Sequence, residues 1–128
     1  MNPGIKNEVS VIVTEERTAA AMGSGTLQVF ATPSMVALME QTAAESVEAL
    51  LEEGNTTVGT MIHVNHLAAT PLGMKVTCKS ELIAVDGRKL VFTIEASDEA
   101  GVIGTAEHER FVVGAARFLE KVNGKIKK

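Results

Sequence analysis

The spacing of apolar residues predicts one long helix in the first half of the chain and a run of strands in the second half. Over residues 33–53, apolar side chains recur every three or four positions, and Gly54-Asn55 supplies a stop signal. After Thr56 the apolar period falls to two, which is the period of strands with one buried face. The strands predicted there span residues 58–69, 74–85, 89–97 and 102–113.

Turn signals indicate how these elements connect. Asp86-Gly87 and the segment 98–101 lie between the last three strands and predict hairpins. We therefore expect an α+β fold, in which the long helix lies across one face of an antiparallel sheet, within a single domain of residues 1–128. Shorter elements are expected at 8–14 (strand), 14–25 (a helical turn and a flexible Gly-Ser-Gly loop), 26–30 (extended) and 115–122 (helix).

Glu40 interrupts the pattern of the long helix. It projects within about 40° of Val36, on the apolar side. A carboxylate in that position is costly unless it is paired or used, so Glu40 is either a functional group or half of a buried ion pair, with Arg110 as a candidate partner. The buried face is expected to carry Val36, Met39, Ala43, Val47 and Leu50, and the opposite face Gln41, Glu45, Glu48 and Glu52.

Alternation along the strands identifies side chains that face the helix. In the strand 58–69, His66 shares its face with two β-branched aliphatic residues, which favours that face as the buried one. In the strand 102–113, Arg110 is expected to point inward, toward a buried anion. A lone histidine in a strand is more often structural than functional, so His66 by itself is a weak candidate.

The start of the long helix has two interpretations. Thr32-Pro33 is a strong start signal, and Thr32 on the simpler interpretation only caps the helix. On the other, its hydroxyl and the free N–H groups of the first turn face a substrate, because helix N-termini stabilise anions and oxyanions. Gly59 predicts a β-bulge or a close approach, and His63 and His108 are interpreted as ordinary sheet residues.

Composition excludes several classes of function. The net charge is -4 and the chain has four Phe but no Trp or Tyr, which argues against a nucleic-acid partner and predicts an aliphatic core. The one cysteine, Cys78, excludes an intrachain disulfide and is expected in a strand as a small apolar filler. No ligand spacing indicates a metal site. No stretch approaches the ~20 apolar residues of a membrane span, and without a signal-like N-terminus we expect a cytoplasmic protein.

Three segments together carry a family resemblance. They read FATPSMVALMEQTAAESV at 30–47, VGTMIHVNHLAATPLGMKV at 58–76 and GTAEHERFVV at 104–113. They resemble the hot-dog-fold acyl-CoA thioesterases, and within them the fluoroacetyl-CoA thioesterase-like family, over nearly the whole chain. The resemblance implies a long helix wrapped by an antiparallel sheet, and a homodimer, or a tetramer of paired dimers, with active sites at the subunit interface.

The resemblance also implies the site residues. The implied catalytic residues are Thr32 in FATP, Glu40 in ALME and His66 in VNHLAATP, and the implied substrate-binding residues are Gly59 in TVGT and Arg110 in HERF. The implied substrate is an acyl-CoA, with coenzyme A as part of the substrate and no other cofactor. Thioester hydrolysis would proceed either through an acyl-enzyme on Thr32 or by direct attack of a water activated by Glu40 or His66.

One departure from the family concerns specificity. The fluoroacetate-specific enzyme has phenylalanines in a lid ahead of its catalytic threonine, whereas residues 14–29 contain no Phe here. We therefore expect a general short-acyl-CoA thioesterase. Two other activities remain open: a hot-dog hydratase or dehydratase, and a non-catalytic domain that binds acyl-CoA. The ordered Thr-Glu-His pattern favours hydrolysis.

Overall fold

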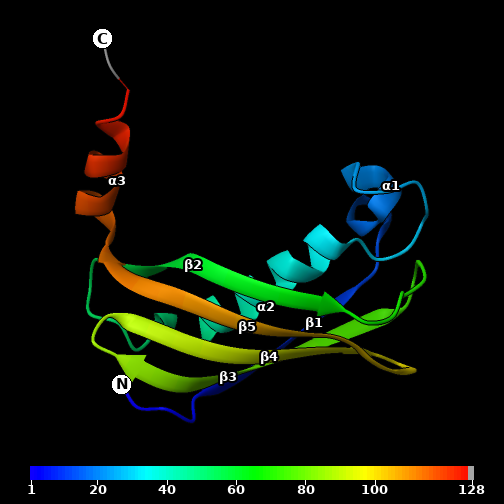
Figure 1. Ribbon diagram of the computed structural model, residues 1–128, viewed down its shortest axis with the longest axis horizontal. Helices are drawn as coiled ribbons and strands as arrows, with labels where there is room; N and C mark the ends of the chain where they lie inside the picture. Colours follow the sequence, from blue (N-terminus) through cyan, green and yellow to red (C-terminus); the bar gives the residue numbers. More distant parts are fainter. Residues whose placement is uncertain (127–128) are drawn as a thin grey trace.

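A computed structural model describes residues 1–126 and confirms the predicted α+β arrangement, a long helix across one face of a five-stranded antiparallel sheet (Figure 1). The predicted strands and the C-terminal helix form within three residues of their expected bounds, whereas the long helix ends earlier than expected. Residues 26–30 form no strand and contribute only isolated bridges. The elements are β1 (Lys6–Ile12), η1 (Glu15–Arg17), α1 (Ala19–Met22), α2 (Thr32–Glu48), β2 (Asn55–His66), β3 (Lys75–Asp86), β4 (Lys89–Asp98), β5 (Gly101–Gly114) and α3 (Ala115–Asn123).

The sheet order is β1-β3-β4-β5-β2, so β1 and β2 are the edge strands. The hairpins predicted at Asp86-Gly87 and at residues 98–101 join β3, β4 and β5 into a meander. β2 pairs with β5 along its whole length, with a register shift between Gly59 and Met61 that confirms the predicted bulge. The other side of β2 faces no strand among residues 1–126, although β2 is one of the longer strands.

Helix α2 packs on the inner face of the sheet and supplies much of the core. Its buried residues are Met35, Leu38, Met39, Thr42, Ala43 and Val47. The buried face is therefore rotated from the predicted one, and Val36 and Glu40 lie at its margin with intermediate exposure. The face rotates because the sheet buries a second row of α2 side chains, Met35, Leu38 and Thr42, beside the predicted row of Met39, Ala43 and Val47.

The predicted C-terminal end of this helix is wrong. Helix α2 ends at Glu48, and Leu50, expected on the buried face, is 59% exposed. Short-range bonds from Leu50 N to Val47 O and from Leu51 N to Glu48 O tighten the chain into a turn there. Gly54, with φ of +85°, then redirects the chain into β2.

The core confirms the expected aliphatic character and the place of the one cysteine. Phe92 of β4 and Leu82 of β3 are fully buried beside residues of α2. Cys78 lies in β3, where it is buried with a free thiol, and burial raises its pKa to about 11.

Cys78 gives a direct test of this core. The folded protein should not react with a chromogenic disulfide reagent at pH 8, because burial blocks access and the raised pKa lowers the thiolate fraction about a hundredfold. In denaturant the same reagent should titrate one thiol per chain. Rapid native reaction would mean that β3 is not packed under α2 as described.

Candidate active site

Thr32 stands at the start of α2, but it does not cap the helix. Ala31 occupies the N-cap position, Thr32 is the first helical residue, and no side chain makes a cap hydrogen bond. The exposed Thr32 hydroxyl instead forms a 2.7 Å hydrogen bond with Nδ1 of His66. The capping interpretation is therefore wrong, because Pro33 follows directly and the helix begins one residue earlier than a capping Thr32 requires.

His66 is the last residue of β2 and faces the helix, as the alternation predicts. Its ring has two different surroundings. Nδ1 faces Thr32, while Nε2 is buried without a hydrogen-bond partner in the described part of the chain. Burial lowers the pKa of His66, and the nearby backbone of Ala68 partly opposes this shift. The imidazole is therefore neutral near pH 7 and able to accept a proton.

Glu40 and Arg110 form a second cluster, away from Thr32. Nη1 of Arg110 lies 4.0 Å from Oε2 of Glu40, and the two side chains are 10% and 42% exposed. Nε of Arg110 donates to the Thr57 hydroxyl at 2.8 Å, and Nη2 donates to the Thr57 carbonyl at 3.1 Å. Burial lowers the pKa of Arg110, and the charges of Glu40 and Glu48 oppose that shift. Arg110 thus points inward toward a carboxylate, as predicted from the strand alternation.

Gly59 lies where this cluster meets the sheet. It is paired with Arg110 across the β2–β5 ladder, just before the bulge. A Cβ on Gly59 would stand 2.9 Å from Oε2 of Glu40 and 3.4 Å from both Nη1 of Arg110 and Cε1 of His108. Both predictions for Gly59 hold, because the residue borders a bulge and also allows a close approach.

His108, expected to be an ordinary sheet residue, instead belongs to the Arg110 cluster. It is 1% exposed, its Nδ1 lies 2.8 Å from the Met61 carbonyl, and its Nε2 lies 3.1 Å from Nη1 of Arg110. One signal in the sequence could have found it. The alternation puts His108 on the same inner face as Arg110, and a buried imidazole must find hydrogen-bond partners.

The five residues predicted for the site fall into two groups within one chain. Thr32 and His66 form one pair, and Glu40, Gly59 and Arg110 form the other. Thr32 and Glu40 are eight residues apart on α2, so their Cα atoms are separated by about 12 Å along the axis. Glu40 of one chain therefore does not complete a hydrogen-bonded triad with Thr32 and His66 of the same chain.

The segment before α2 is folded against the start of that helix. The Thr18 side chain accepts a bond from Ala21 N and caps α1, and Ala19 N donates to Val29 O. Ser34 Oγ contacts Sδ of Met22 at 2.7 Å. Residues 14–29 thus form a short lid beside Thr32 whose large apolar members, Met22 and Leu27, are exposed.

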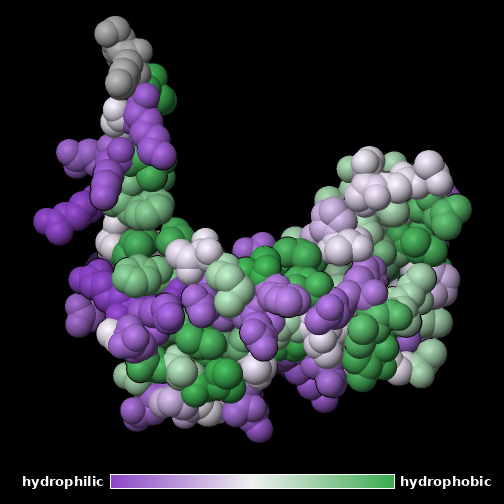
Figure 2. All heavy atoms as spheres, in the orientation of Figure 1, coloured by the Kyte–Doolittle hydropathy of each residue, from purple (hydrophilic) through white to green (hydrophobic). Residues whose placement is uncertain are grey.

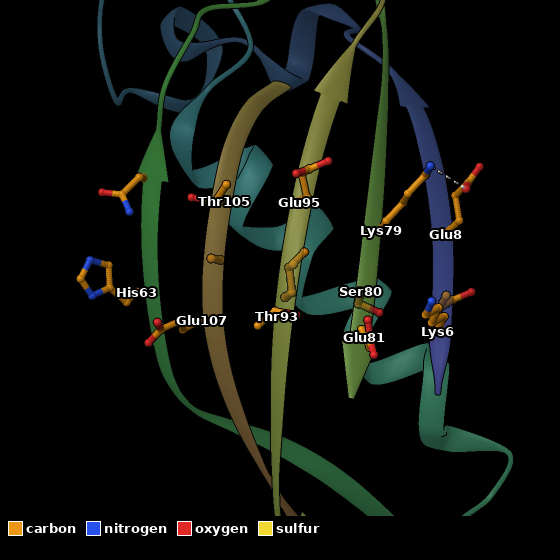
Figure 3. Close-up of a pocket in the computed structure, with 14 residues that line it drawn as sticks. Lys6, Glu8, His63, Lys79, Ser80, Glu81, Thr93, Glu95, Thr105 and Glu107 are labelled. Atoms are coloured by element: carbon orange, nitrogen blue, oxygen red, sulfur yellow. Dashed lines mark ion pairs between the residues drawn. The ribbon is translucent and has the colours of Figure 1, made fainter. Parts of the chain in front are cut away.

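The described surface also has a hollow away from these residues. It is an open groove of about 1120 Å³ across the strands, lined by charged and polar side chains such as Lys79, Glu95, Glu107 and His63 (Figure 3). Helix α2 lies behind the sheet in this view. None of the five predicted site residues lines the groove, which lies on the face of the sheet opposite α2.

Two further observations bear on the class of protein. Among residues 1–126, no helix is both long and apolar enough to cross a membrane. The same residues contain no group of three or more His, Cys, Asp or Glu side chains placed to hold a metal ion.

Comparison with known proteins identifies the family. The family described as fluoroacetyl-CoA-specific thioesterase, FlK, matches residues 13–116. The fluoroacetyl-CoA thioesterase of Streptantibioticus cattleyicolor is 43% identical over 100 residues, which are 78% of this chain and 69% of that protein.

Solved structures agree with this match. A structure of the fluoroacetyl-CoA thioesterase FlK superposes with a TM-score of 0.93 at 34% identity, over 99% of this chain and 98% of that one. A hot-dog-like protein from Thermanaerovibrio acidaminovorans superposes with a TM-score of 0.91 at 25% identity, over 100% and 95% of the two chains. The chain therefore belongs to the fluoroacetyl-CoA-specific thioesterase (FlK) family of hot-dog acyl-CoA thioesterases.

Proposed function

We propose that this protein hydrolyses a short acyl-CoA thioester, with Thr32, Glu40 and His66 as catalytic residues. The observation that carries the proposal is the 2.7 Å hydrogen bond between Thr32 Oγ1 and His66 Nδ1. A hydroxyl is a weak nucleophile until a neighbouring base takes its proton, and this distance allows that transfer. Ligands bound to similar solved structures agree with this substrate class: one FlK mutant is in complex with acetyl-CoA, and another is in complex with fluoroacetate and CoA.

The proposed chemistry needs only water and groups of this chain, and it can follow two routes. In one route His66 takes the Thr32 proton, Oγ1 attacks the thioester carbonyl, and the C–S bond breaks to release CoA. Water then hydrolyses the acyl ester on Thr32. In the other route Glu40 or His66 activates water directly. In both, the tetrahedral oxyanion needs hydrogen-bond donors, and the free N–H groups of Thr32 and Ser34 in the first turn of α2 are available for this.

Gly59 and Arg110 are proposed to bind the substrate near Glu40. The missing side chain of Gly59 leaves room beside the Glu40 carboxylate, and Arg110 brings a positive charge to the same place. We propose no cofactor beyond the CoA carried by the substrate. We also propose a cytoplasmic location, where the free Cys78 thiol would persist in its reduced form.

We propose that a homodimer joins the two separated groups of residues. Two copies of β2 can pair antiparallel along their open edges, as unpaired strand edges tend to do. A two-fold axis between Ile62 and His63 would put Gly59 of one copy opposite His66 of its partner. Each site would then combine Thr32 and His66 from one chain with Glu40 from the other. Further pairing of dimers into a tetramer is compatible with this arrangement.

The C-terminal helix supports the same proposal. α3 extends past the β2 edge of the sheet, away from the rest of the chain (Figure 1). None of its residues is buried, and Leu119 and Val122, three positions apart and so on one side of the helix, are 58% and 41% exposed. Figure 2 shows apolar surface beside charged surface along this helix. So short a helix is unstable without tertiary packing. Pairing of two β2 edges would bring α3 of one copy toward the lid end of its partner.

A free-thiol assay on a panel of acyl-CoA substrates tests the activity. The wild type should release CoA, whereas a hydratase or a binding domain should leave the thioester intact. Thr32→Val and Glu40→Gln should each fold with a melting temperature close to that of the wild type and lose about 10²- to 10⁴-fold in turnover, the usual contribution of a nucleophile or general base. Glu45→Gln, on the exposed side of α2, is the matched control. A Glu40→Gln protein that melts early but turns over normally would assign Glu40 to a structural ion pair.

Mixed dimers test the shared site. Thr32→Val and Glu40→Gln chains, each inactive alone, are denatured, mixed in equal amounts and refolded. About a quarter of wild-type activity should return, because half of randomly mixed dimers are heterodimers and each has one intact site. If each chain held a complete site, no mixture would exceed the activity of the two variants alone.

Substrate selectivity is expected to differ from that of a fluoroacetyl-specific enzyme. The lid lacks phenylalanine, and a small difference in apolar contact contributes only about 1–3 kcal/mol. We expect similar kcat/KM for fluoroacetyl-CoA and acetyl-CoA, and tolerance of butyryl-CoA, measured under one set of conditions. A preference for the fluorinated substrate above about a thousandfold, equivalent to roughly 4 kcal/mol, would contradict this expectation.

A further inference from the structure

His108 is a buried histidine whose two ring nitrogens are both engaged. It lies in β5, opposite Ile62 of β2 and Phe92 of β4 in the ladder. The Phe92 ring packs beside it, with centroids 6.1 Å apart and planes tilted by 32°. Nδ1 lies 2.8 Å from the Met61 carbonyl, and Nε2 lies 3.1 Å from Nη1 of Arg110. The ring is therefore held in one orientation.

The partners of His108 fix its protonation state. A guanidinium only donates, so Nε2 must accept from Arg110 and carries no proton. A carbonyl only accepts, so Nδ1 carries the proton and donates it to Met61. Burial lowers the pKa of His108, and the charge of Arg110 adds to this, while the Met61 bond and the charge of Glu40 oppose it. The neutral Nδ1–H form is the one that satisfies both neighbours.

Three hydrogen bonds hold the Arg110 guanidinium, and only the bond to His108 engages Nη1, the nitrogen that faces Glu40. The two bonds to Thr57 engage Nε and Nη2. Nη1 is shared between His108 at 3.1 Å and Glu40 at 4.0 Å. A close guanidinium–carboxylate pair has N–O distances of about 2.7–2.9 Å, so the Glu40 contact is long. Nη1 is therefore bonded to His108 rather than closed onto Glu40.

We infer that His108 is a positioning residue, which holds Arg110 back from Glu40 and so keeps the Glu40 carboxylate free to act on substrate or water. A tight ion pair would occupy the Glu40 oxygens and make the carboxylate a poorer base. The room beside Gly59 allows that closure, since Glu40, Arg110 and His108 all border it. The inference rests on the proposed catalytic role of Glu40.

Two amide variants separate the roles of the two ring nitrogens. In His108→Asn the amide takes the place of Nδ1 and keeps a donor for Met61, but no acceptor reaches Arg110. In His108→Gln the longer side chain places a carbonyl near Nε2 and restores that acceptor. Glu107→Gln, on the exposed face of β5 next to His108, serves as the control for a substitution in the same strand.

Turnover per folded molecule and the structure of the variants test the inference. His108→Asn should lower kcat about ten- to a hundredfold, the effect expected from losing a hydrogen bond to a charged group, while His108→Gln stays within about threefold of wild type. A crystal structure of His108→Asn should show Arg110 closed onto Glu40. Equal kcat for the Asn and Gln variants, or an unchanged Arg110–Glu40 distance, would overturn the inference.

Two readouts keep the test decisive. If His108→Asn fails to fold, the nitrogen chemical shifts of His108 in the wild type must still show a protonated Nδ1 and a bare Nε2, and any other form would overturn the inference. Glu40→Gln distinguishes the proposed catalytic role of Glu40 from the positioning role of His108. If it remains active, the proposed role of Glu40 fails, whereas an inactive Glu40→Gln beside a fully active His108→Asn removes only the role of His108.

Discussion

The burial of a guanidinium on the inner face of the sheet is the constraint on which the rest of the site depends. Removing Arg110 from water costs several kcal/mol unless its N–H groups find partners. Thr57 on β2 and His108 on β5 provide them, and the Glu40 carboxylate on α2 lies 4.0 Å from Nη1, so one side chain joins three elements. This network requires Gly59 to stand opposite Arg110, which fixes the register of the edge strand β2. The same register brings His66, at the far end of β2, to the first turn of α2.

The edge strand therefore carries one member of each residue group, and its geometry explains why the groups are apart. Gly59 and His66 both lie on β2, while Glu40 and Thr32 lie on α2, so each end of the strand meets a different part of the helix. Among residues 1–126, β2 pairs on one side only, and the proposed homodimer would use its open edge. A catalytic site divided in this way would make activity depend on assembly.

The lid contacts the start of α2, where Ser34 Oγ lies 2.7 Å from Sδ of Met22 and Ala31 N donates to Arg17 O. Its own backbone bonds and the Thr18 cap hold residues 14–29 together, and Phe30 and Ala31 connect it to α2. The Thr32–His66 hydrogen bond itself uses no lid side chain. A lid without phenylalanine is therefore compatible with an intact Thr32–His66 pair, which is the combination behind the selectivity proposed above.

Apolar periodicity was enough to predict the order of the elements, the helix-facing side of β2 and β5, and the unusual positions of Glu40, His66 and Arg110, because it depends only on which side chains must leave water. Thr32 and Gly59 were singled out by a helix start signal and by a glycine within a strand, and the resemblance to the thioesterase family implied the roles of all five. Three features appear only in the folded chain: the end of α2 at Glu48, the bond from Thr32 to His66 in place of a cap, and the engagement of His108 with Arg110. Each depends on residues far apart in the chain, and no local pattern records which of several possible partners a polar group meets when the helix closes over the sheet.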